Sequence, residues 1–123
     1  MDMKLELVPM PVSDPDASLA FYQNKMGFHL DHDVQPGNGM RIIQLTPPGS
    51  ACSIVFGTGM DDRKPGSMSH LHLVVADVAK ARKLLLERGV EVSDIDDMGG
   101  GVKYAYCADP DGNSWALQEI AHN

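Results

Sequence analysis

The chain has 123 residues, enough for one compact domain or two small fused halves, and its 43% hydrophobic and 22% charged residues are typical of a globular protein. The net charge of −7, without any basic cluster, argues against nucleic acid and anionic membrane surfaces as partners. No apolar run approaches the roughly 20 residues of a membrane helix, and the N-terminal segment lacks the features of a signal peptide. We therefore expect a cytoplasmic protein with reduced cysteines at Cys52 and Cys107.

The first half begins with a predicted strand at residues 5–12, followed by a helix. Asp14 suits the N-cap, and Pro15 suits the first helical position, where its missing N–H costs no hydrogen bond. Gly27 is placed to end the helix as the residue after its C-cap. Between these signals, apolar residues recur at helical spacing, at Leu19, Tyr22 and Met26.

Two further strands are predicted at residues 40–45 and 52–56, joined by the Pro- and Gly-containing segment TPPGSA. Residues 58–69 are polar and contain Gly and Pro, which is typical of a linker. The first half therefore covers residues 1–57.

The second half opens with SHLHLVV, which places two histidines two residues apart in an otherwise apolar run. Side chains at i and i+2 of a strand point to the same face, so His70 and His72 are expected side by side. Asp77 then suits the N-cap of a helix that Gly89 ends.

Strands are predicted at residues 102–107 and 114–120, around a strong turn signal at residues 109–112. The acidic, Gly-rich residues 93–101 are expected to form a solvated connection or a mobile loop that acts as a lid.

The chain partly repeats itself after 63 residues. LVPMPVSD (residues 7–14) falls on HLHLVVAD (residues 70–77), and PPGSACSIVF (residues 47–56) falls on PDGNSWALQE (residues 110–119). The order of elements predicts an α+β protein of two βαβββ modules, residues 1–57 and 70–121, related by a pseudo-twofold axis.

Three segments, VSDPDASLAFYQNKMGF, HLHLVVADVAKARKLLLERGV and DPDGNSWALQE, resemble the vicinal oxygen chelate superfamily. This superfamily includes glyoxalase I, extradiol dioxygenases and the bleomycin resistance protein. The resemblance implies a single domain over residues 1–123, in which two βαβββ modules form a cupped half-barrel sheet around a small-molecule site. It also implies a homodimer.

In the metal-using members of the superfamily, ligands of the His, Gln or Glu type come from four strand positions. The resemblance carries these positions onto Leu7, Ser53, His70 and Ala116, of which only His70 is a good ligand. A catalytic centre needs about three N or O ligands. His72 lies roughly 6.5 Å along the strand from His70, and Glu119 has the wrong parity for the cup. We therefore expect no metal or other cofactor, the alternative being a divalent metal held by His70, His72 and an unforeseen carboxylate.

Side chains alternate between the two faces of a strand, and this alternation predicts which of them line the cup. Trp115 is expected on the other face, in the core. Tyr104 and Tyr106 share a face and can stack on a flat ligand. The candidate ligand-binding residues are Leu7, Pro9, Ser53, Val55, His70, His72, Tyr104, Tyr106, Ala116 and Gln118.

The favoured hypothesis is a protein that binds or sequesters a partly apolar small molecule, as drug-sequestering members of this superfamily do in antibiotic resistance. Conversion of that compound stays open, with His70 and His72 as candidate acid/base groups. The alternative is a metal-dependent glyoxalase-like lyase or isomerase, or a dioxygenase, that uses both histidines as ligands. A third interpretation makes them hydrogen-bonded core residues.

Overall fold

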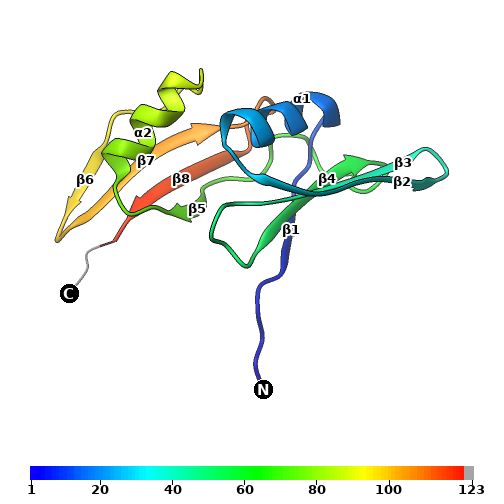
Figure 1. Cartoon of the computed structure of the whole chain (residues 1–123), viewed down its shortest axis with the longest axis horizontal. Coiled ribbons are helices and arrows are strands. Elements are labelled where there is room, and N and C mark those ends of the chain that lie inside the picture. Colours follow the sequence, from blue (N-terminus) through cyan, green and yellow to red (C-terminus); the bar gives the residue numbers. More distant parts are fainter. Residues whose placement is uncertain (121–123) are drawn as a thin grey trace.

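The computed structural model describes residues 1–120, so the expected end of the second module at residue 121 lies outside the described residues. Two four-stranded sheets lie side by side, each with helices on one face (Figure 1). No helix in residues 1–120 is long and apolar enough to cross a membrane.

Both sheets have the same topology, which confirms two tandem βαβββ modules. The first sheet has the order β1-β4-β3-β2 and the second the order β5-β8-β7-β6. In each sheet the first strand pairs in parallel with the last, and the remaining neighbours are antiparallel. The first module consists of β1 (Leu7–Pro9), α1 (Pro15–Ala20), η1 (Phe21–Lys25), β2 (His29–Gly37), β3 (Met40–Thr46) and β4 (Ser53–Thr58). The second consists of β5 (Leu71–Val74), α2 (Val78–Glu87), β6 (Asp96–Gly99), β7 (Val102–Ala108) and β8 (Ser114–Glu119).

The predicted helix signals are confirmed. The Asp14 carboxylate accepts hydrogen bonds from two backbone N–H groups of α1, and the Asp77 carboxylate accepts one from Lys80 of α2. Gly27 and Gly89 have φ of 77° and 85°, the left-handed conformation in which glycine ends helices.

The first helix differs from the expected regular α-helix, because it changes after Ala20 into the π-helical turn η1. Met26 N–H donates to the carbonyl of Phe21, five residues earlier, at 3.0 Å. With this wider turn, the adjacent rings of Phe21 and Tyr22 are both buried in the core.

One hydrophobic core joins the two modules. The ring of Tyr22 lies 5.5–5.8 Å from those of Phe28, Phe56 and Trp115, measured between centroids, and Trp115 comes from the second sheet. The Tyr22 hydroxyl donates to Asp109 at 2.8 Å and accepts from the Trp115 indole N–H at 3.0 Å. The expectation that Trp115 is a core residue is confirmed.

Three segments differ from the expectation. The strand predicted at residues 5–12 is reduced to Leu7–Pro9, because prolines lack the N–H that continues a ladder. Residues 96–99 form strand β6 within the expected loop, on the edge of the second sheet. All four are exposed, and Asp96, Asp97 and Gly99 are residue types that are also typical of a loop. Strand β4 extends to Thr58, into the expected linker.

Candidate functional site

Each sheet has one face that packs on the helices and one open face. In β4, Ile54 and Phe56 lie in the core, so Ser53 and Val55 alternate with them onto the open face of the first sheet. The parallel ladder pairs Ser53 with Leu7 and Val55 with Pro9. The four first-module residues predicted to line a cup therefore form one contiguous patch.

The six second-module candidates also share one face. Ala116 of β8 is paired with His72 on one side and with Tyr106 on the other, and Gln118 is paired with Tyr104. Ala116 has no exposed surface, because these neighbours cover it. Ala116 therefore packs beneath its neighbours and offers no surface for contact with a ligand.

Four rings on this open face form what we call the aromatic platform, comprising His70, His72, Tyr104 and Tyr106. The two tyrosine rings stack with their centroids 6.1 Å apart and their planes at 8°. His70 lies 5.3 Å from Tyr106, and His72 lies 5.6 Å from Tyr104 in an edge-on arrangement. Gln118 donates a hydrogen bond of 3.1 Å to the Tyr104 hydroxyl and so holds that ring in place.

His70 is not part of the strand, contrary to expectation. It precedes β5 with φ of 52°, and its backbone N–H donates to the Ser114 hydroxyl at 2.8 Å. The only other non-glycine residue with positive φ among residues 1–120 is Asn38, in the turn between β2 and β3. The left-handed backbone at His70 places the imidazole against Tyr106.

The strand ladders also correct the expected correspondence between the two modules. Leu7 is paired with Ser53, whereas His72, and not His70, is paired with Ala116. Equivalent residues of β1 and β5 are therefore two residues further apart in the sequence than equivalent residues of β4 and β8. Sequence reasoning missed this because Asp14 follows β1 at a greater distance than Asp77 follows β5.

The donor set does not fit a metal centre. Two of the four positions that the family would use, Leu7 and Ala116, are hydrocarbon side chains in the structure as in the sequence. Among residues 1–120, no three His, Cys, Asp or Glu side chains come together in a way that could hold an ion. Glu119, as expected, points to the helix side, where it accepts a hydrogen bond from the N–H of Val78 at 2.8 Å.

A second polar group, which the sequence analysis did not identify, lies on the open face of the first sheet. The Thr46 hydroxyl is 2.5 Å from a carboxylate oxygen of Asp31 and 2.6 Å from the hydroxyl of Ser53. The three residues come from three strands, β2, β3 and β4. Of the three, only Ser53 was predicted. Asp31 reaches this face through an irregularity in strand pairing, which the sequence does not reveal.

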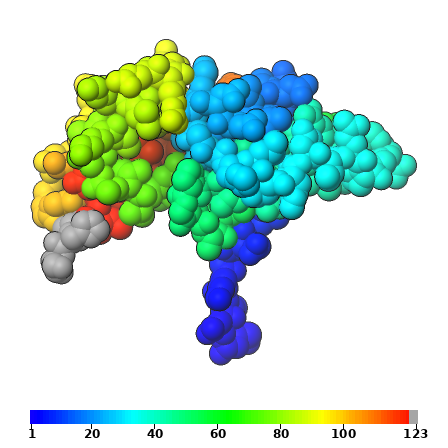
Figure 2. Space-filling model, viewed as in Figure 1, coloured from blue at the N-terminus to red at the C-terminus, as the bar shows by residue number. Residues whose placement is uncertain are grey.

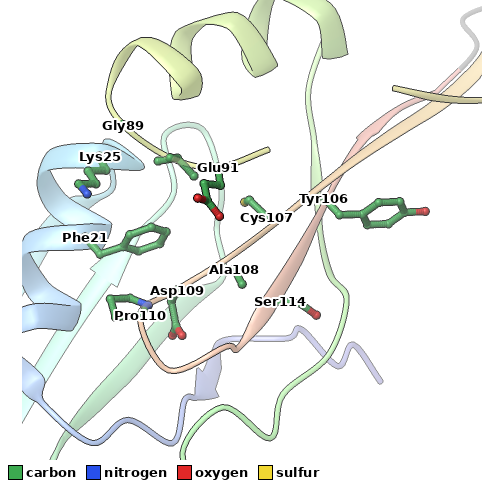
Figure 3. Close-up of a pocket in the computed structure, with 11 residues that line it drawn as sticks. Phe21, Lys25, Gly89, Glu91, Tyr106, Cys107, Ala108, Asp109, Pro110 and Ser114 are labelled. Atoms are coloured by element: carbon green, nitrogen blue, oxygen red, sulfur yellow. The ribbon is translucent and has the colours of Figure 1, made fainter. Parts of the chain in front are cut away.

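Two cavities formed by the described residues each have one member of the platform at their border. One, of about 550 Å³, is formed between η1 and the β7–β8 hairpin, and Tyr106 at its border points away from the other lining residues (Figure 3). The other, of about 510 Å³, lies between the β3–β4 connection and α2, with His72 at its border. The other candidate residues line neither cavity, and three of them, Ser53, Val55 and Ala116, are at most 5% exposed.

Residues 4–117 match the sequence model of the Glyoxalase/Bleomycin resistance protein/Dioxygenase superfamily. TnmS3, an antibiotic binding protein from Streptomyces sp. CB03234, is 34% identical with a TM-score of 0.86, and the match covers 98% of each chain. A glyoxalase/bleomycin resistance protein from the same organism is 36% identical with a TM-score of 0.79, covering 93% of this chain and 98% of that one. A superfamily member from Sphaerobacter thermophilus is 32% identical with a TM-score of 0.83, covering 97% and 98%. None of the curated proteins matches.

Proposed function

Because the chain belongs to the Glyoxalase/Bleomycin resistance protein/Dioxygenase superfamily, we propose that it binds a flat, partly apolar organic compound without using a metal ion. The observation that carries this proposal is the aromatic platform of His70, His72, Tyr104 and Tyr106. The similarity to TnmS3, an antibiotic binding protein, supports sequestration of an antibiotic-like molecule as the biological role. We propose the cytoplasm as the location of this activity.

The platform has the properties that stacking requires. Its four rings lie on an open face rather than in the core, and the contact from Gln118 to Tyr104 orders one ring before any ligand arrives. Aromatic pairs in offset or edge-on contact contribute about 0.5–1.5 kcal/mol beyond their burial of apolar area. A ligand with extended aromatic rings can contact several members at once, whereas a small aliphatic compound cannot.

The hydrogen bond of His72 fixes its tautomer. Its Nδ1 lies 2.8 Å from the carbonyl oxygen of His70, and a carbonyl only accepts, so Nδ1 carries a proton. In the neutral ring Nε2 is therefore an acceptor, able to receive a hydrogen bond from the ligand. The same atom is the group that would take up a proton if the compound is also converted.

The binding of 1-methoxypyrene, a flat fluorescent probe, tests this proposal. We expect saturable binding to the wild type, weakened about fivefold by Tyr104→Leu or Tyr106→Leu, because each removes one stacking contact. Tyr104→Phe is the matched control, since it keeps the ring and loses only the contact with Gln118, so most of the affinity should remain. Fluorescence titration and melting curves measure the two effects separately. A wild type that does not bind the probe contradicts the proposal.

The same titration after treatment with EDTA separates this function from the metal-dependent alternative. Affinity should be unchanged, since no ion contributes to stacking. A purified protein that carries near-stoichiometric transition metal and loses binding with EDTA would instead support a lyase, isomerase or dioxygenase.

A further inference from the structure

We propose that Asp31, Thr46 and Ser53 form a hydrogen-bond acceptor site, which selects compounds that carry a donor group such as a hydroxyl or an ammonium. This proposal deepens the proposed function and rests on it. In this proposal the open face of the first sheet determines which ligands bind, and the aromatic platform on the second sheet provides the stacking contacts.

Counting protons gives the direction of the chain of hydrogen bonds. The carboxylate of Asp31 only accepts, so the single hydroxyl proton of Thr46 is donated to it across 2.5 Å. Thr46 then has no proton left for Ser53, so the 2.6 Å contact between the two hydroxyls must use the proton of Ser53. The hydroxyl of Ser53 is left with free lone pairs and no proton, which makes it an acceptor only.

The strand pairing directs Asp31 to this face. Leu30 is paired with Leu45 and His32 with Gln44, so Asp31 is an extra residue in β2, a β-bulge. In a regular strand, only one of Asp31 and His32 would lie on the open face, whereas the bulge allows both side chains to lie there. Bulges often re-aim a side chain next to a functional site, because they break the alternation of the strand at one position.

Burial makes the polarity of this group matter. Ser53 is only 5% exposed and the side chain of Asp31 22% exposed, and Ser53 lies between Leu7 and Thr46 on neighbouring strands. His29 is a titratable group that faces Asp31, with its Nε2 3.8 Å from the other carboxylate oxygen. A ligand that places an ether or carbonyl oxygen here leaves acceptors facing each other, whereas a donor pairs with one of them.

Three pyrene probes that differ at one substituent test the selectivity. We expect the wild type to bind 1-hydroxypyrene or 1-pyrenemethylammonium about tenfold more tightly than 1-methoxypyrene, because only the first two donate a hydrogen bond. Thr46→Val keeps the shape of the side chain and frees the proton of Ser53, which can then be donated to the ether oxygen. It should therefore strengthen the binding of 1-methoxypyrene and reduce the preference. Thr58→Val, which removes an exposed hydroxyl from the other end of the first sheet, is the matched control and should keep the preference.

The outcomes separate this proposal from the proposed function. Equal affinity of the wild type for all three probes overturns the acceptor site but leaves the platform intact, and so does a preference that is undiminished in Thr46→Val. Failure of every probe to bind overturns both proposals. If the wild type prefers the ammonium probe and Asp31→Asn removes this preference, the natural ligands are cationic. If it prefers the hydroxyl probe, they are phenolic. Either result supports the acceptor site.

Discussion

His70 adopts a left-handed backbone that costs roughly 1–2 kcal/mol for a residue with a Cβ atom. His70→Gly removes this cost and His70→Ala keeps it, while both remove the ring from Tyr106. We therefore expect the glycine variant to be about 1 kcal/mol more stable than the alanine variant, and both to bind 1-methoxypyrene more weakly than the wild type. Urea unfolding and probe titration measure the two quantities. Equal stability of the two variants would show that the backbone relaxes when the ring is removed.

At the scale of elements, the hydroxyl of Tyr22 joins η1 of the first module to β8 and to the residue after β7 of the second. Burial and the nearby carboxylate of Asp109 raise the pKa of Tyr22, so its hydroxyl stays protonated and remains a donor. Tyr22→Phe leaves the indole N–H of Trp115 without this acceptor and removes one donor from Asp109. We expect a loss of about 1–3 kcal/mol in the free energy of unfolding, measured with urea. A loss below about 0.5 kcal/mol would mean that water replaces the hydroxyl.

Helix ends, which depend on residues within one turn, were predictable from the sequence. Features that depend on how strands pair with one another were not. Asp14, Gly27, Asp77 and Gly89 act within their own turns, so their roles follow from residue type and spacing. Strand β6 and the bulge at Asp31 depend on the partner strand, as does the ladder that places His72 opposite Ala116. The sequence therefore predicted which side chains share an open face in each module, but it missed Asp31, Thr46 and the position of His70.

At the scale of the whole molecule, apolar side chains on both open faces remain uncovered. Leu7 on the first sheet is 38% exposed and Val74 on the second is 63% exposed. Residues 1–6 project from the body as an arm (Figure 2), and Leu5 in this arm is 73% exposed. Exposed apolar area of this kind marks an interaction surface, and a second copy of the chain is the partner that the superfamily resemblance implies.

Light scattering at micromolar concentration tests this assembly. We expect a homodimer, with twice the mass of one chain, and we expect Leu7→Asp to shift it toward the monomer, because a carboxylate would be buried at the contact without a partner. Lys4→Asp is the control, since it adds the same carboxylate to an exposed residue before strand β1 and should leave the dimer intact. Leu7 lies at the start of β1 and is partly exposed, so the variant should keep its fold, as circular dichroism can verify. A monomeric wild type contradicts the prediction, and the open faces would then have to bind ligand without a partner to cover them.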